Sequence, residues 1–365
     1  MVRSLLHLWI YRSVNGVAQP KYVWSGSLPS QSTANITLGN FNAITGSNII
    51  KIWTALPNGQ PDERPSNDTI MAMFTGCDSL LSGTYTLGNG GTFANMSALT
   101  TAISSCGIGG PVVIQMLPGK YSEMIFNGTI PGTDSINTIT FTSYNNNVDS
   151  VIIESTTGNE ASVHLSGGAS YLIFDHLTVN GCMNNGVSVS AGFGLFGCSY
   201  IKIQNCKINV LPEDNWNYSY AGIYTSWQNS QFDHIWIDNN EIKGSQFGIY
   251  LESNTLSGPV FIRDNKINTR YCGLCSYDYI ILSNLSYNTI EYDTNSTTGE
   301  YNPFRCYGWM TQGSLPDTMW IVGNKIRFNA VGSINYGGFS LYDFHPSDAL
   351  VMANNENHTT KILHN

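Results

Sequence analysis

From residue 112 onward the sequence repeats one short pattern, and this repeat constrains the fold more than any other feature. Each copy has an apolar residue, a second two positions later, a turn-forming Asn at plus five and an apolar residue at plus seven. Ile235, Ile237, Asn240 and Ile242 form one such copy. Copies start at residues 112, 139, 172, 201, 235, 260, 283, 319 and 350, about 30 residues apart on average. This spacing predicts two or three short strands per copy and leaves no room for a helix.

A second set of positions repeats in the same register, where a Gly followed by an apolar residue opens another short strand. These glycines are Gly186, Gly222, Gly248, Gly273, Gly308 and Gly338. A coil of parallel strands, each bonded to the equivalent strand one turn later, satisfies both patterns and buries the apolar residues in one core. The recurring Asn is expected to tolerate a left-handed backbone and to bond its amide to the next Asn in a ladder. The predicted fold class is therefore all-β.

Three segments near the start of the repeats carry a resemblance to a known family. They are Ser82-Gly-Thr-Tyr-Thr-Leu-Gly, Cys106-Gly-Ile-Gly-Gly-Pro-Val-Val and Pro118-Gly-Lys-Tyr-Ser-Glu. Residues 82–365, roughly three-quarters of the chain, resemble the right-handed parallel β-helix proteins of the pectate-lyase-like superfamily. The resemblance implies a right-handed solenoid of about nine rungs, typical of secreted bacterial surface proteins. It leaves activity open, because the superfamily includes lyases, hydrolases, epimerases and non-catalytic adhesins.

The one good helical pattern lies in residues 92–106, and Gly107 offers a C-cap. The apolar residues that share its face are Phe93, Met96, Leu99 and Ile103. A solenoid needs a terminal element to cover its open core, so this helix is expected to cap the entrance to the coil. The expected organisation is an N-terminal module at 1–75, a linker and first strand at 76–91, and the capped β-helix at 92–365.

The N-terminal module has short alternating strands separated by Asn-Gly and Pro-rich turns. They are expected around Val14–Val17, Tyr22–Trp24, Ile36–Leu38 and Ile49–Trp53. The segment resembles the later strands of a bacterial immunoglobulin-like (CARDB-type) adhesion module, a β-sandwich whose complete form has about 100 residues. Residues 1–75 are therefore expected to lack the first strands of such a module. Either the chain is a fragment, which is the preferred explanation, or another chain completes the module by β-augmentation.

Composition excludes several classes of partner. Charged residues make up 11% of the chain, against about 25% in ordinary globular proteins. The net charge is −9 with 16 basic residues and no basic run, which argues against nucleic acid. Apolar stretches are only a few residues long, so no membrane insertion is expected. The apolar run in Met1–Tyr11 is interrupted by His7 and makes a poor signal peptide, yet the resemblance favours an extracellular or cell-surface location.

The eight cysteines are too dispersed for a disulfide scaffold. Cys77 and Cys106 are a candidate pair that would tie the linker to the cap. Cys206 stands where other copies have Asn, and it is expected to face inward as a small apolar residue. Cys272 and Cys275 lack the further ligands of a zinc site. No Asp-rich calcium loop is present either, so no cofactor is expected, with calcium left open.

Aromatic and acidic residues recur four and five positions after the repeated Gly, near Trp216 in a longer loop. The residues predicted to bind a ligand are Trp216, Trp227, Glu252, Tyr277, Asp278, Tyr342 and Asp343. Aromatic rings pack on sugar faces and carboxylates bond hydroxyls, so this column favours a neutral or cationic glycan over an acidic one. The alternative interpretation is an ordinary solvated edge with Tyr and Asp as turn formers.

Catalysis has weaker support. A glycosidase needs two carboxyl groups about 5 to 9.5 Å apart, and rungs about 4.8 Å apart make Glu252, Asp278 and Asp343 the weak candidates. A lyase acting on acidic polysaccharide needs a Lys or Arg base, but the available arginines do not form a column. These are Arg263, Arg270 and Arg305.

The expected function is a secreted or cell-surface, non-catalytic β-helix protein for adhesion or glycan binding. The alternative is a polysaccharide-degrading enzyme, a lyase or glycoside hydrolase, on the same scaffold. The partner expected in either case is a glycan or a cell-surface polymer.

Overall fold

The computed structural model of the chain divides it into two compact units, Met1–Leu80 with Ser104–Gly107, and Leu81–Ile103 with Ile108–Asn365. The residues that it describes are 4–44, 46–62, 64–77, 79–155, 161–181, 191–210, 220–226, 231–292, 300–306, 318–328, 335–336, 339–341, 349–353 and 356–357.

The N-terminal unit is one antiparallel sheet in the order β2-β1-β4-β5, with β3 also paired to β1. Its elements are β1 (Leu5–Val14), β2 (Val17–Ala18), β3 (Tyr22–Leu28), β4 (Gly46–Ala55), β5 (Thr69–Gly76) and the 3-10 turns η1 (Pro57–Gly59) and η2 (Pro65–Asn67). Asn15 and Gly16 have φ of 51° and 80°, the left-handed pair that a tight hairpin between β1 and β2 requires. Ile10 and Val14 are the buried hydrophobic residues among the described residues of this sheet.

Two strand predictions for this unit were wrong, because Ile36–Leu38 has no regular structure and Val14–Val17 spans the turn between β1 and β2. The apolar run in Leu5–Val14, for which no strand was predicted, is the longest strand of the unit together with β4. Burial alternates only weakly along Leu5–Val14, because the aromatic residues on the face opposite Ile10 are half-buried too. Tyr11 and Trp53 stack there at 5.6 Å between ring centroids.

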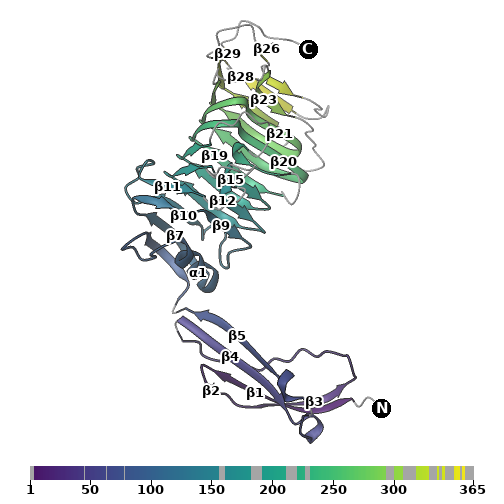
Figure 1. The fold of residues 1–365 in the computed structure, drawn as a ribbon. Coiled ribbons are helices and arrows are strands. Elements are labelled where there is room, and N and C mark those ends of the chain that lie inside the picture. Colours follow the sequence, from purple (N-terminus) through teal and green to yellow (C-terminus); the bar gives the residue numbers. More distant parts are fainter. Residues whose placement is uncertain are drawn as a thin grey trace. The chain divides into compact units, whose positions relative to one another are not determined.

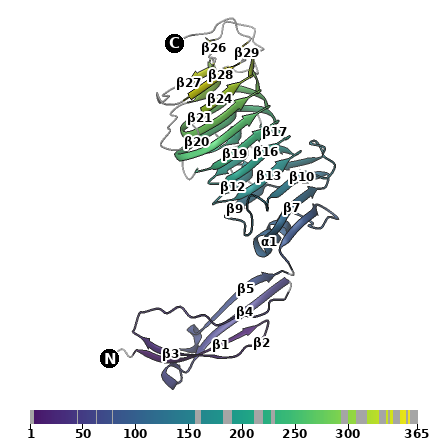
Figure 2. The ribbon, with the colours of Figure 1, turned by 180° about the vertical axis from the view of Figure 1, so that it is seen from behind.

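The second unit is a parallel β-solenoid, which confirms the all-β coil at that level. Its strands stack in chain order (Figure 1, and from behind in Figure 2), and most pair in parallel with the strand three further along the chain, so that one coil contains three strands. The first coils contain β6 (Leu81–Leu87), β7 (Ile108–Met116), β8 (Gly119–Tyr121), β9 (Met124–Asn127), β10 (Ile139–Ser143), β11 (Val151–Glu154), β12 (Ala161–Ser166), β13 (Ser170–Asp175), β14 (Thr178–Asn180) and β15 (Ala191–Phe196).

Further along, two long strands pass through all three sheets of a coil. The remaining strands are β16 (Ser199–Gln204), β17 (Lys207–Asn209), β18 (Ala221–Tyr224), β19 (Asp233–Asp238), β20 (Glu241–Arg263), β21 (Lys266–Ser286), β22 (Thr289–Tyr292), β23 (Glu300–Cys306), β24 (Thr318–Val322), β25 (Lys325–Phe328), β26 (Asn335–Tyr336), β27 (Phe339–Leu341), β28 (Ala349–Ala353) and β29 (Glu356–Asn357).

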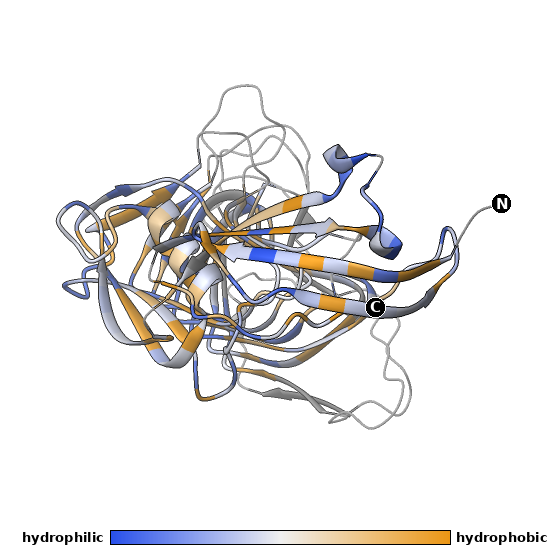
Figure 3. Ribbon diagram, turned by 90° about the horizontal axis from the view of Figure 1, so that it is seen from below, coloured by the Kyte–Doolittle hydropathy of each residue, from blue (hydrophilic) through white to orange (hydrophobic). Residues whose placement is uncertain are grey.

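The predicted repeat register matches the observed one except at the copy that starts at 283, where Val260 pairs with Leu282 and Phe261 with Asn284 across a register shift. In the other copies the first apolar residue pairs with its equivalent one coil later, as Ile201 does with Ile235 and Ile235 with Val260. These inward residues are fully or almost fully buried. Phe141 and Phe174 continue the same core with rings stacked 5.4 Å apart. Figure 3 shows hydrophobic and hydrophilic residues alternating along the strands, as a core on one face requires.

The predicted helix is α1 (Met96–Cys106), and Met96, Leu99 and Ile103 are buried on its face as expected. It starts later than predicted, because the Asn95 side chain accepts a 2.9 Å hydrogen bond from the Ala98 amide and caps the first turn. Phe93 therefore lies before the helix and bridges to Leu87. In the described part of the chain, no helix is long and apolar enough to span a bilayer.

The solenoid begins one strand before this helix. Strand β6, within the 76–91 segment expected to hold a first strand, already pairs in parallel with β7, and α1 lies between these two strands in the chain. A disulfide between Cys77 and Cys106 joins the segment after β5 to the end of α1, as the sequence indicated. Cys272 and Cys275 form a second disulfide within β21.

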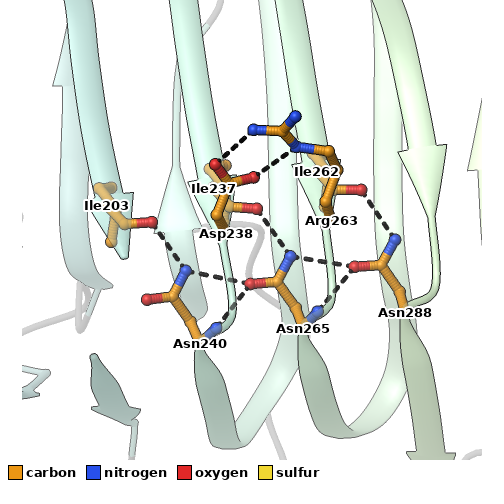
Figure 4. A network of polar contacts seen from close by, with 8 residues as sticks. All are labelled: Ile203, Ile237, Asp238, Asn240, Ile262, Arg263, Asn265 and Asn288. Atoms are coloured by element: carbon orange, nitrogen blue, oxygen red, sulfur yellow. Dashed lines mark hydrogen bonds and ion pairs between the residues drawn. The ribbon is translucent and has the colours of Figure 1, made fainter. Parts of the chain in front are cut away.

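The asparagine ladder is present (Figure 4). Asn240, Asn265, Asn288 and Asn324 are buried, and each side-chain amide donates to the next side-chain oxygen at 3.0 Å. Cys206 occupies the equivalent ladder position one coil before Asn240. It is 2% exposed and donates its backbone N–H to the Asn240 side chain, as an inward residue of this column should.

One expectation about these asparagines was wrong. The left-handed residue of each turn is the residue before the ladder position, with φ of 54° at Asn239, 58° at Asp264 and 56° at Tyr287. The ladder side chains must point into the coil, so the preceding residue makes the turn and points outward.

The glycine column differs from its prediction in two coils. Gly222, Gly248 and Gly273 share a register, and a Cβ at Gly222 or Gly248 would lie 2.4 or 2.3 Å from an isoleucine of the opposite wall. In the preceding coil Gly192 has this role, with 2.5 Å to Ile208. Gly186 lies outside the described residues. Gly308 was misplaced, because Leu274 pairs with Phe304 and the position after Cys272 therefore matches Pro303.

Candidate functional site

The outward positions of β13, β16, β19 and the end of β20 form the most distinctive surface of the solenoid. Inward residues such as Ile201 and Ile235 alternate there with half-buried outward residues. The register aligns Ile173 with Lys202 and Lys202 with Trp236. Trp236 aligns in turn with Phe261. One apolar, basic and aromatic column therefore crosses four consecutive coils.

A second column precedes it by two residues. Tyr171, Tyr200 and His234 each come directly before the first inward residue of a copy. Tyr200 lies between the other two rings, 4.6 Å from Tyr171 and 4.7 Å from His234, and both pairs are within 10° of parallel. Because both faces of the Tyr200 ring are covered, this column presents ring edges and hydroxyl groups to solvent.

All three residues of this ring column adopt a left-handed backbone. Their φ values are 62° at Tyr171, 55° at Tyr200 and 53° at His234. This conformation costs an L-residue with a large side chain roughly 1–2 kcal/mol. Such strain persists only where the surrounding structure imposes it, and it recurs at functional sites. Here it recurs at the same position of three successive coils.

Trp236 contacts residues of both columns. Its ring stacks on Phe261 at 5.7 Å and 7°, and it lies 5.8 Å from His234 at a tilted angle. Arg263 follows in the next outward position and binds Asp238 through two hydrogen bonds, 2.9 Å from Nε and 2.6 Å from Nη2. This bidentate bond raises the pKa of the Arg263 guanidinium.

A groove of about 440 Å³ runs along these columns. It is lined by Ser135, Thr138, Tyr171, Ile173, Tyr200, Lys202, Trp236 and Arg263. Lys202 is half-buried in it, and among the described residues its ammonium group has no hydrogen-bond or ion-pair partner. The groove therefore combines apolar walls, phenol hydroxyls and one positive charge that is available to a ligand.

A larger hollow of about 780 Å³ lies near the starts of the same strands. It is lined by Gly168, Gly197, Ser199, Gln231, Asp233, Asn254 and Thr255. Asp233 has its carboxylate 2.8 Å from Nδ1 of His234, at ion-pair distance but without the geometry of a hydrogen bond. Partial burial, followed by the charges of Asp233 and Tyr171, raises the pKa of Tyr200, which keeps its phenol protonated.

The predicted ligand-binding residues that the structure describes, Glu252, Tyr277 and Asp278, lie on a different sheet of the solenoid. Glu252 pairs in register with Tyr277, and both are half-buried. Asp278, of which the backbone alone is described, pairs instead with the buried Ser253. Because neighbouring positions of a strand alternate in direction, Glu252 and Asp278 belong to different columns. Trp216, Trp227, Tyr342 and Asp343 lie outside the described residues.

Glu252 has local partners. The Tyr250 hydroxyl donates to its carboxylate at 3.2 Å, and Thr225 bonds its backbone. Tyr250 contacts Phe247 and Tyr277 at 5.3 Å between ring centroids in each case. The Cys272–Cys275 disulfide packs in the same buried cluster, so this region is aromatic and largely enclosed.

The arginines considered for lyase chemistry occupy separate columns. Arg263 pairs in register with Ser286, and Arg305 pairs with Cys275. Arg270 lies in β21 before the disulfide. In the part of the chain that the structure describes, no three His, Cys, Asp or Glu side chains gather as metal ligands would. Burial raises the pKa of the Cys198 and Cys206 thiols to about 12 each, so both are inert.

Sequence reasoning missed the ring columns, although a signal was present. An aromatic residue stands directly before the first inward residue in three consecutive copies, at Tyr171, Tyr200 and His234. Both columns are visible in the sequence when each copy is compared at two positions. One is the residue directly before the first inward residue, and the other is the residue between the two inward ones.

The comparisons with known proteins add little to this description. No family model matches the chain, and no curated protein sequence matches it. Among solved structures, the chain is similar to the crystal structure of Escherichia coli YbhC, at 12% identity and a TM-score of 0.42. That similarity covers 83% of this chain and 90% of YbhC.

Proposed function

We propose that this chain is a non-catalytic, extracellular or cell-surface solenoid that binds a glycan in the groove beside Tyr171 and Tyr200. The observation that carries the proposal is the half-buried, unpaired Lys202 ammonium of the described groove, set among ring edges and apolar side chains. Sugars present both hydroxyl groups and apolar C–H faces, and a groove with phenol hydroxyls beside Trp236 and Ile173 matches both.

The charge of the groove favours a glycan that carries acidic groups. Arg263 is neutralised by Asp238 across its bidentate contact, whereas Lys202 has no such partner among the described residues. An anion bound at Lys202 gains a charge-assisted hydrogen bond in a half-buried setting, where screening by water is reduced. This preference differs from the neutral or cationic glycan expected for the Glu252 column, which remains a separate prediction.

Solution binding with a panel of acidic and neutral oligosaccharides tests the proposal. Lys202→Ala is expected to weaken binding of acidic oligosaccharides roughly tenfold or more, because hydrogen bonds to charged groups contribute about 1.5–3 kcal/mol. Tyr200→Phe removes the hydroxyl but keeps the ring stack, and it is expected to cost a few-fold. Lys243→Ala is the control, since Lys243 pairs with Glu241 on another sheet. Equal effects of Lys202→Ala and Lys243→Ala would contradict the groove.

The alternative is a polysaccharide-degrading enzyme, and the Asp233–His234 contact beside the larger hollow is the observation that favours it. A carboxylate next to an imidazole is a common source of a general base. Incubation with the same oligosaccharides, followed by assays for new reducing ends and for unsaturated products, separates the two functions. Turnover that is lost in His234→Gln would overturn the non-catalytic proposal.

We also propose the finer features of the fold. The solenoid is right-handed, since strand crossovers of this kind are right-handed in about 98% of cases. It has about nine rungs and belongs with the pectate-lyase-like β-helices, to which segments such as Pro118–Glu123 are similar. The N-terminal sheet is part of an immunoglobulin-like module, and its sparsely buried face supports a missing layer.

A further inference from the structure

Strand β5 is an open edge of the N-terminal sheet. It pairs over its whole length with β4, without a register shift, and it is the last strand in the sheet order. Among the described residues no strand pairs with its other side. An edge of this kind presents a row of backbone N–H and C=O groups that a further strand can bond.

This edge lacks the features that normally prevent pairing. Residues Thr69–Gly76 include no charge and no proline. Ile70, Met71 and Met73 are 66%, 61% and 73% exposed. The opposite edge of the sheet is protected, because it is divided between β2 and β3 and carries a register shift between Leu5 and His7. The contrast singles out β5 as the edge suited to a partner.

The sequence of β5 identifies the partner. Thr-Ile-Met-Ala-Met-Phe-Thr reads almost the same in both directions about Ala72. In a two-fold antiparallel pair centred on Ala72, Thr69 lies opposite Thr75 of the second copy, Ile70 opposite Phe74, and Met71 opposite Met73. Thr–Thr and β-branched–aromatic pairs are among the favourable cross-strand pairs.

We propose that β5 pairs antiparallel with β5 of a second copy of this chain, centred on Ala72, and joins two N-terminal sheets into one continuous sheet. The contact is isologous, so one strand supplies both surfaces. It brings the exposed Met71 of each copy into contact with Met73 of the other, in a sheet where Ile10 and Val14 are the buried hydrophobic residues described.

Sedimentation velocity of the full chain over a range of concentrations tests the proposal. The unsubstituted chain is expected to form a dimer. Met71→Glu with Met73→Glu places like charges opposite each other twice across the axis, and it is expected to weaken dimerisation about 100-fold. Both residues are exposed in the single chain, and Met71 faces Lys51 on β4, so these substitutions leave the subunit folded.

A charge exchange tests the register itself. Met71→Glu with Met73→Lys places opposite charges across the same axis, and it is expected to restore the dimer and to make it sensitive to salt. Ile136→Glu, at a 75% exposed position of the solenoid, is the control for an added surface charge. A monomer at every concentration, a dimer unaffected by the double Glu variant, or failure of the Glu/Lys variant to restore it would each overturn the proposal.

Discussion

Nδ2 of Asn265 donates a 3.0 Å hydrogen bond to Oδ1 of Asn288 inside the solenoid. The same amide also donates to the backbone oxygen of Ile237, and the side-chain oxygen accepts from the backbone and side chain of Asn240. One buried side chain thus satisfies polar groups of the coil before it and the coil after it, which is why the turn position repeats in the sequence.

Asn265→Ala is expected to lower the free energy of unfolding by about 3 kcal/mol, because it removes the buried hydrogen bonds that Asn265 makes with the Asn240 backbone N–H, the Asn240 side chain and the Ile237 carbonyl. Urea unfolding followed by circular dichroism measures the change. Asn239→Gly is the matched control, since Asn239 makes an exposed contact with Asn205 and is left-handed. Equal losses in the two variants would argue against the ladder as a source of stability.

Cys206→Asn is expected to stabilise the chain by about 1 kcal/mol, because it extends the ladder by one residue. The Cys206 sulfur now lies 3.6 Å from the Phe174 carbonyl and weakly accepts from the Leu177 backbone, and an amide in its place makes stronger bonds to both. The melting temperature of the variant measures this gain. A decrease would show that the site cannot accommodate the amide.

Tyr200→Gly is expected to be less destabilising than Tyr200→Ala by about 1 kcal/mol, because Gly adopts the left-handed conformation without a steric penalty. Both variants lose the ring stack, so their difference isolates the backbone. At Thr140, an outward strand residue without a positive φ, the order is expected to reverse. Chemical unfolding of the four variants measures both differences. If the Gly variant were the less destabilised of the pair at both positions, the result would contradict backbone strain at Tyr200.

Cys198 and Cys206 are expected to resist alkylation at pH 8 until the chain unfolds, because burial raises the pKa of each thiol from 9.0 to about 12. The raised pKa means that the folded state binds these protons more tightly. Stability from this source is complete below about pH 9 and is lost as the pH rises toward 12. Iodoacetamide labelling with peptide mass spectrometry measures the reactivity. Labelling of the native chain at the rate of the unfolded chain would contradict the burial.

Reduction of the Cys77–Cys106 disulfide is expected to destabilise the first coil by about 3 kcal/mol, because the bond closes a loop of 29 residues in the unfolded chain. Cys77→Ser with Cys106→Ser is the corresponding variant. Limited proteolysis is expected to cut residues 78–95 first in that variant. Unchanged cleavage would show that α1 holds this segment without the bond.

The alternation of Ile235 with Ile237, followed by Asn240, was enough to predict a coil of parallel strands and its register. Local chemistry decides both features, since period two fixes which residues face the core and a buried Asn needs an equivalent neighbour. The pairing of Cys77 with Cys106 and the buried face of α1 were also predictable, because each depends on residues close in the chain.

Gly308 shows where the sequence was insufficient. It follows the same local pattern as Gly273, yet Pro303 occupies the matching position, because turns of different length separate the strands and hydrogen bonding between coils selects the register. The left-handed residue of the turn was likewise displaced by one position, since only the packed coil shows that the Asn side chain must point inward.

The sequence by itself therefore determined that this chain coils, and which side chains form its core. Only the tertiary structure decided what the outer surface presents. Tyr171, Tyr200 and His234 lie 29 and 34 residues apart in the chain, and they become a stack because equivalent positions of successive coils are bonded side by side. Burial imposes a strict periodicity on inward residues, whereas outward residues become neighbours only when successive coils pair through hydrogen bonds.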